Sequence, residues 1–260
     1  MNTRKAKPSN GAIIYRGPSL LDGKPIVVIV VGLNASSKNR KTGNMLQTYI
    51  LRDDINPIDA VKTGADESIC GNCIHRGDGK GKKRTCYVNL GQGALSVYKA
   101  LQRGVYPVMN PSGLGVLRLV RIGTYGDPAA VPAYVWGQLL WGAVGHTGYT
   151  HQWRNTGALP VAQLDFLRQY CMASADHIDE ANEAQQQGWR TFRVVMPGQT
   201  VRMNLESTCP ASAEAGKKLT CDTCMACNGT SRNRRGSIAI KAHGSSAVMA
   251  NVKAIYGAAA

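Results

Sequence analysis

Two separated groups of cysteines are the feature that most restricts how this chain can fold. The second group has two-residue gaps inside a triplet, and its members are Cys209, Cys221, Cys224 and Cys227. Such gaps let consecutive thiolates reach three corners of one iron–sulfur cubane, and a remote cysteine followed by proline is a usual further ligand. A single zinc ion is more often held by two separate C-x₂-C turns. We therefore expect a [4Fe-4S] cluster here, with zinc, disulfide bonds or free thiols as the alternatives.

The first group supplies three cysteines, Cys70, Cys73 and Cys86. Gly71, directly after Cys70, lets the backbone turn so that two thiolates can face one metal. The loop between Cys73 and Cys86 is rich in lysine and arginine, and this charge favours thiolates and an anionic cluster. The same loop could bind phosphate or be a solvated turn. Because only three ligands are local, the site either recruits a fourth or leaves one iron open to a substrate or to S-adenosylmethionine. A zinc knuckle is the alternative.

Two residues are candidates for that fourth ligand, Cys171 and His75. Cys171 stands alone in an apolar stretch, where a cysteine more commonly fills the core than binds a metal. It nevertheless brings the number of cysteines to eight, which divides into two four-thiolate sites. The sequence leaves this choice open.

Charge and hydropathy restrict the partners of the chain. Its 260 residues include 31 Lys and Arg against 16 Asp and Glu, a formal net charge of +15. An excess of this size indicates an anionic partner, a nucleic acid or a nucleotide. The strongest apolar run, Ile26–Val31, is too short to span a bilayer, and no apolar segment directly follows the basic N-terminus. We expect a cytoplasmic protein without membrane contact, and in a reducing compartment cysteines serve more often as ligands than as disulfides.

Strand-like and helix-like segments alternate from residue 116 onward. Strands are expected at 26–33, 116–122, 146–152, 169–173, 191–196, 201–205 and 237–241. Helices are expected at 93–103, 130–140, 161–168, 178–187 and 247–256. Alternation with short links favours parallel βαβ units. The sequence predicts one α/β domain over residues 1–260, with cysteine-rich metal-binding insertions at 67–90 and 206–236.

Polar, titratable residues recur where these strands end, and the candidates for catalysis among them are Arg121, Asp127 and His151. Parallel α/β folds place their chemistry at the carboxyl ends of strands. The alternatives are a structural Arg121–Asp127 ion pair and a hydrogen-bonded structural histidine. A basic run at 231–235 is expected to border the second cysteine group.

With these motifs in place, the chain resembles an uncharacterised phage protein family, the gene product eighty-eight type. The shared features are Lys41-Thr42-Gly43, Cys86-Tyr87, Arg121 with Gly126-Asp127, Tyr149-Thr150, and Cys209-Pro210 before the cysteine triplet. Members of that family look like relatives of the radical-SAM enzymes. The resemblance therefore implies a partial (β/α) barrel, iron–sulfur chemistry and an infected bacterial host. The Cys-x₃-Cys-x₂-Cys signature of radical-SAM enzymes is absent, so the first cysteine group would have to hold its cluster with a different spacing.

These observations predict an iron–sulfur protein with one or two [4Fe-4S] clusters. The main hypothesis is a radical-SAM-like enzyme that acts on a nucleotide or nucleic acid, with a cluster on each cysteine group. The alternative is a non-catalytic nucleic-acid-binding protein in which zinc or an iron–sulfur cluster staples the fold. A small electron-transfer module is a third hypothesis, for which the chain is large.

Overall fold

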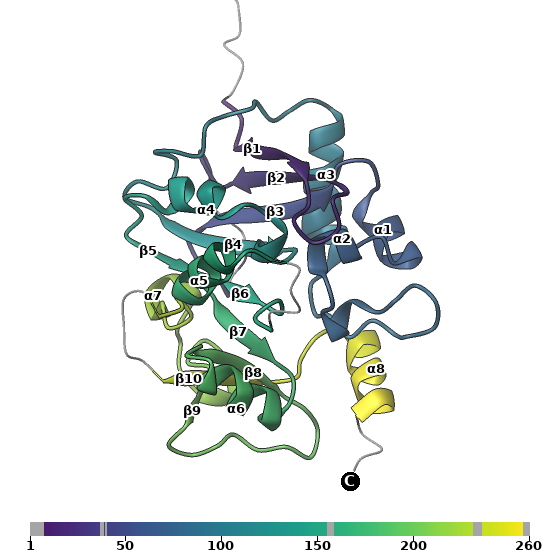
Figure 1. Cartoon of the computed structure of the whole chain (residues 1–260), viewed down its shortest axis with the longest axis vertical. Helices are drawn as coiled ribbons and strands as arrows, with labels where there is room; N and C mark the ends of the chain where they lie inside the picture. Colours follow the sequence, from purple (N-terminus) through teal and green to yellow (C-terminus); the bar gives the residue numbers. More distant parts are fainter. Residues whose placement is uncertain (1–7, 37–38, 40, 155–158, 231–235, 257–260) are drawn as a thin grey trace, which may run out of the picture.

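The computed structural model describes residues 8–36, 39, 41–154, 159–230 and 236–256, and it has a mixed α/β fold with two five-stranded sheets (Figure 1). The strand order of the first sheet is β1-β2-β3-β4-β5, and that of the second is β6-β7-β8-β10-β9. The predicted α/β class is therefore confirmed. The two sheets lie one above the other in Figure 1, with β5 and β6 where they meet.

The first sheet combines antiparallel and parallel pairs. Its strands are β1 (Gly11–Pro18), β2 (Pro25–Val31), β3 (Leu46–Arg52), β4 (Leu119–Tyr125) and β5 (Gly145–Thr147). Strand β2 is antiparallel to both β1 and β3, whereas β3, β4 and β5 run parallel. The run Ile26–Val30 is fully buried, as expected for a central strand covered on both faces.

The second sheet is entirely parallel. Its strands are β6 (Tyr149–Thr150), β7 (Met172–Ala175), β8 (Thr191–Val195), β9 (Glu206–Thr208) and β10 (Ser237–Lys241). Parallel strands need crossover connections, and helices supply several of them here. Because all of these strands point the same way, their carboxyl ends meet along one edge of the sheet.

The helices are short and flank the sheets. They are α1 (Pro57–Thr63), α2 (Glu67–Cys70), α3 (Leu95–Gln102), α4 (Ala133–Leu140), α5 (Val161–Tyr170), α6 (Ile178–Gln186), α7 (Cys221–Cys224) and α8 (Ser246–Tyr256), with 3₁₀ or π turns at Ile74–Arg76, Leu90–Ala94, Pro128–Ala130 and Ala213–Ala215. Two buried tryptophans tie helix and loop to the sheets, because Trp136 Nε1 donates to the Pro128 carbonyl and Trp153 Nε1 to the Ser174 carbonyl. Within the described ranges, no helix has the length and apolar character needed to traverse a membrane.

Gly148 is the single residue between β5 and β6, so the chain passes directly from the first sheet into the second. Its N–H donates to the Cys227 carbonyl, and its carbonyl accepts from the Met172 N–H. A Cβ atom at this position would lie 2.6 Å from Ile122 Cγ1 and 2.9 Å from Cys171 Sγ. The junction of the two sheets therefore requires the absence of a side chain.

We expect Gly148→Ala to lower the free energy of unfolding by about 1–3 kcal/mol, because the added methyl group overpacks a buried contact. Chemical denaturation followed by circular dichroism measures the change. Gly236→Ala is the matched control, since a Cβ there meets nothing within 4 Å. Equal stability of the Gly148→Ala variant and the unchanged chain would contradict the packing described for this junction.

Most segments predicted from the sequence are present, but one predicted strand is absent and some strands were not predicted. The expected strand at 201–205 is wrong: this segment turns, with Asn204 at a φ of 70°, and β9 begins at Glu206. The reason is tertiary, because buried Arg193 holds the Glu206 carboxylate with bonds of 2.8 and 2.7 Å and so fixes where the strand starts. Strands β1 and β3 were not predicted, and neither was the antiparallel half of the first sheet.

Candidate functional site

A cavity of about 800 Å³ opens where the parallel strands end. Seven of the eight cysteines line it, namely Cys70, Cys73, Cys86, Cys209, Cys221, Cys224 and Cys227. The ends of β4, β6, β7, β8 and β10 contribute further lining residues, among them Asp127, His151, Ser174, Met196 and His243. The two cysteine groups, far apart in sequence, therefore face one shared space.

The second cysteine group is built on α7 and on a turn from the N-terminal part of the chain. Thr220 caps α7 through a capping box with Thr223. The Cys221 N–H donates to the Lys41 carbonyl at 2.9 Å, and the Asp222 carboxylate accepts from the Asn44 N–H at 2.8 Å. The Lys-Thr-Gly segment of the sequence is thus a docking turn for this group.

The first cysteine group is shaped by a sharp turn after α2. Gly71 has a φ of 57°, in the region that favours glycine, as the sequence predicts. The loop then folds back on itself, because the His75 carbonyl accepts hydrogen bonds from the N–H groups of both Thr85 and Cys86. Helix α8 braces this loop from the C-terminal end of the chain, where Asn251 Nδ2 donates to the Arg84 carbonyl at 2.9 Å.

Asp176, at the end of β7, fastens the first cysteine loop to the second sheet. Its carboxylate is 2.7 Å from His75 Nε2 and 3.6 Å from His151 Nε2, and its side chain is only 3% exposed. His151 Nε2 also lies 3.7 Å from Cys73 Sγ. His75 Nδ1 contacts Thr85 Oγ1 at 2.8 Å, which fixes the ring orientation. Since one nitrogen of His151 meets both Asp176 and Cys73, the three do not form a Cys-His-Asp relay, which needs both ring nitrogens.

The pKa values of Asp176 and His151 are both shifted by their neighbours. The hydrogen bonds from His151 and His75 outweigh the effect of burial and hold the pKa of Asp176 well below its usual range. Burial alone would lower the pKa of His151, but Cys73 and Asp176 reverse this and raise the pKa well above 6.5. Asp176 and His151 therefore stabilise each other's charged forms.

Burial raises the pKa of several of the thiols that line the cavity. Burial raises the pKa of Cys70 well above its usual value, and the nearby Cys73 and Cys86 raise it further. Burial likewise raises the pKa of Cys227 to about 12, with Cys209 and Cys221 adding to the effect. The pKa of Cys70 and that of Cys227 are thus each affected by cysteines of their own group. A cation bound there would have to displace protons.

The cysteine sulfur atoms of the described residues do not converge on one point, as the ligands of a single metal ion would. Four thiolates at about 2.3 Å from zinc lie about 3.8 Å from one another. Among the described residues, the only three or more His, Cys, Asp or Glu ligand atoms that all lie within 4.8 Å of each other belong to His75, His151 and Asp176. These three side chains could bind a metal ion, whereas no three cysteines of the described chain are as close as a mononuclear site requires.

The three residues predicted for catalysis all line the cavity. Arg121 and Asp127 form no ion pair with each other, although both are described. Asp127 instead accepts hydrogen bonds from the N–H groups of His151 and Ala129, at 2.7 and 2.9 Å. Burial raises its pKa. Asp127 therefore holds the backbone at His151. The structural Arg121–Asp127 ion pair considered from the sequence is wrong.

Cys171 lies apart from the cavity. It is fully buried in the main hydrophobic core, at the C-terminal end of α5 and close to the position of Gly148. Its environment matches the core-filling alternative. The other candidate fourth ligand, His75, lines the cavity but is bonded to Asp176. The predicted basic run at 231–235 lies outside the described residues.

Two buried hydroxyl groups at the cavity have no hydrogen-bond partner in the described protein, those of Tyr125 and Thr147. Buried hydroxyls are normally satisfied, so an orphan beside a cavity points to a missing ligand or cofactor. Tyr125 is close enough to Cys70 and Cys86 for both to raise its pKa, although burial is the larger cause. Sequence reasoning missed Tyr125 and Thr147, because nothing local marks a buried hydroxyl that lacks a partner. It placed Asp176 only among the polar residues at strand ends, since the histidines that contact it come from other parts of the chain.

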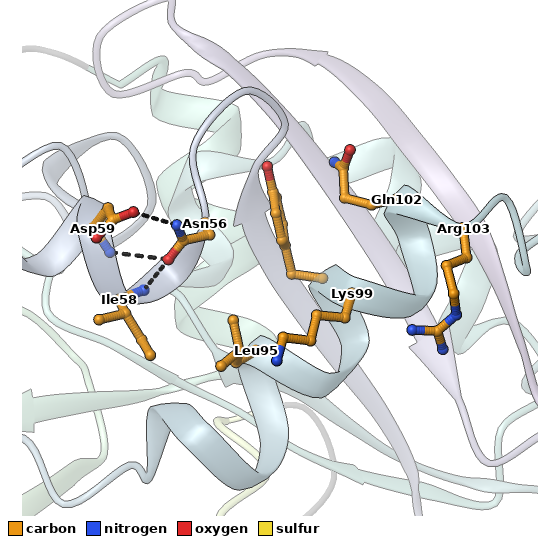
Figure 2. A pocket seen from close by; sticks show the side chains of 8 residues that line it. Asn56, Ile58, Asp59, Leu95, Lys99, Gln102 and Arg103 are labelled. Atoms are coloured by element: carbon orange, nitrogen blue, oxygen red, sulfur yellow. Dashed lines mark hydrogen bonds between the residues drawn. The ribbon is translucent and has the colours of Figure 1, made fainter.

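A second hollow lies between α1 and α3 (Figure 2). Asn56, which caps α1 through bonds to the N–H groups of Ile58 and Asp59, stands at one side, and Lys99 and Arg103 stand at the other. It is shallow and holds no cysteine or histidine. The cysteine-lined cavity is therefore the candidate functional site.

Comparisons with known proteins do not assign this site: no family model, no curated protein and no solved structure matches the chain.

Proposed function

We propose that this chain is an iron–sulfur protein of phage type that binds clusters through its two cysteine groups. The observation that supports this most directly is that seven cysteines from distant parts of the sequence line one cavity. Thiols gathered at a cavity, with no disulfide among them, are suited to soft metal centres. Cys70, Cys73 and Cys86 would hold one [4Fe-4S] cluster, and Cys209, Cys221, Cys224 and Cys227 the other.

The cysteine spacing fits a cluster better than a single ion. In a cubane each thiolate binds a different iron, so the sulfurs stand further apart than around zinc, and a cluster would not require three of them to lie within 4.8 Å of one another. The orphan hydroxyl of Tyr125 beside Cys70 and Cys86 would gain a hydrogen-bond acceptor from a cluster sulfide or thiolate. Bound clusters would supply electron transfer and, at an iron without a protein ligand, a position for substrate.

The proposed activity is that of a radical-SAM-like enzyme. The cavity lies at the carboxyl ends of parallel strands, the position of active sites in α/β folds. We propose that the two sheets, joined through Gly148, are halves of one curved sheet that forms a partial (β/α) barrel. The first group has three cysteines, which leaves one iron available for S-adenosylmethionine. Its substrate would be a nucleotide or nucleic acid in the host cytoplasm, which the net charge of +15 favours.

Metal analysis tests the proposal. We expect anaerobically purified protein to be brown, with about eight irons and an equal amount of sulfide per chain if both groups hold cubanes. Colourless protein with two zinc ions and no sulfide would overturn the iron–sulfur assignment in favour of a zinc-stapled nucleic-acid-binding protein.

Electron paramagnetic resonance of the reduced protein tests the open iron. We expect added S-adenosylmethionine to change the spectrum of the first cluster, because direct coordination alters the electronic environment of its iron. An unchanged spectrum at saturating S-adenosylmethionine would exclude its use by the reduced protein and leave a non-catalytic cluster protein.

A further inference from the structure

Four arginines of the described chain are buried, and they differ in how their charge is met. Arg52 pairs with Asp54, and Arg193 with Glu206. Arg190 donates to four oxygens, including the Asn228 side chain. A buried guanidinium requires such partners, because an unpaired charge is costly to remove from water.

Arg121 is the exception. It is 8% exposed, lines the cavity, and forms no ion pair with any carboxylate of the described residues. Its neighbours are the phenol rings of Tyr149, whose centroid is 5.0 Å from Arg121 Cζ, and of Tyr87. Neither ring carries a negative charge at neutral pH. The guanidinium hydrogen-bonds the hydroxyls of both tyrosines, but no carboxylate of the described residues neutralises its charge.

Thr147 is the neighbour of Arg121 on the adjacent strand. The two residues are paired in the parallel register of β4 and β5, and both line the cavity. Thr147 is 1% exposed, and its hydroxyl is one of the buried groups without a partner in the described protein. A buried cation that no carboxylate neutralises, beside a hydroxyl without a hydrogen-bond partner, is suited to binding an oxyanion.

We propose that Arg121 and Thr147 bind a phosphate or carboxylate group of a small molecule that occupies this cavity. Lys41 adds a second cation, since it lines the same cavity and both it and Arg121 lower the pKa of Cys221, which burial raises. The volume, about 800 Å³, is within the range of small-molecule sites, about 300–1,000 Å³. The inference adds a ligand class and its binding residues to the proposed function, and it does not require either cluster to be present.

Isothermal titration of anaerobically purified protein with pyrophosphate, inorganic phosphate and succinate tests the site. We expect one of these probes to bind at one equivalent. Arg121→Gln should weaken binding by about 30-fold or more, the effect of removing one member of a buried charge pair. Tighter binding of pyrophosphate and phosphate would identify a phosphate ligand, and tighter binding of succinate a carboxylate ligand.

Thr147→Val separates binding from structure. Removing an unsatisfied hydroxyl should leave the stability of the ligand-free protein unchanged or higher, yet weaken anion binding by about 10-fold. Arg16→Gln is the matched charge control, because Arg16 is half exposed, pairs with Asp53 and does not line the cavity. It should leave binding unchanged. If Arg121→Gln fails to fold, Arg121→Lys and Thr147→Val decide the matter.

Absence of binding by all three probes would overturn the inference and assign Arg121 to charge compensation of a cluster alone. Equal binding by the unchanged chain and by Arg121→Gln, or by Thr147→Val, would overturn it as well. Iron and sulfide content, measured on the same samples, keeps this test separate from the proposed function. If the protein binds an oxyanion but contains no iron, the cluster proposal is wrong and the inference of an oxyanion site is supported.

Discussion

Cys86→Ser is expected to lose about four of about eight irons while the spectrum of the second cluster remains. Cys86 belongs to the first cysteine group and not to the Cys221 triplet. Burial raises the pKa of its thiol, and the nearby Cys73 raises it further. A serine hydroxyl is a poor ligand for iron compared with a thiolate. Iron and sulfide analysis with electron paramagnetic resonance of the remaining cluster measures the effect.

The eighth cysteine provides the control for this experiment. Cys171 is fully buried in the core and does not line the cavity, so Cys171→Ala should retain all of the iron. Its cost should be confined to stability, as for other losses of buried volume. If Cys171→Ala loses a cluster, or if Cys86→Ser loses both, the division into two independent cysteine sites is wrong.

Asp176→Asn is expected to lower the free energy of unfolding by about 3 kcal/mol and to reduce occupancy of the first cluster. The carboxylate is nearly fully buried and meets both His75 and His151, and an imidazolium left without its partner is costly. The first cysteine loop would also lose its attachment to β7. Urea denaturation gives the change in stability, and metal analysis gives the occupancy.

An exposed acidic residue gives the comparison. Asp165 pairs with Arg168 on the surface of α5, where ion pairs contribute little, so Asp165→Asn should change neither stability nor iron content appreciably. The second cluster should persist in Asp176→Asn, because the docking of α7 on Lys41 does not involve Asp176. A variant with full iron content and unchanged stability would show that the Asp176–histidine contacts do not hold the loop.

Local pattern predicted some elements of the fold well and others not at all. Apolar periodicity and length located β2, β8, β10 and the helices α3 to α6, because each has a buried face that its own residues define. Strands β1 and β3 were not predicted, although each contains buried apolar residues; pairing with β2, and for β3 also with β4, sets their places in the sheet. The start of β9 was missed because Arg193, on another strand, positions Glu206.

The sequence by itself determined which residues could take part in metal chemistry: two cysteine groups with ligand-like spacing, and polar residues where strands end. Only the tertiary structure decided that both groups face one cavity, that Cys171 belongs to the core, and that Asp176 ties His75 and His151 together. The physical reason is that ligand spacing is a local property of the chain. The pairing of a buried charge, or its absence at Arg121, depends on atoms brought together from strands far apart in sequence.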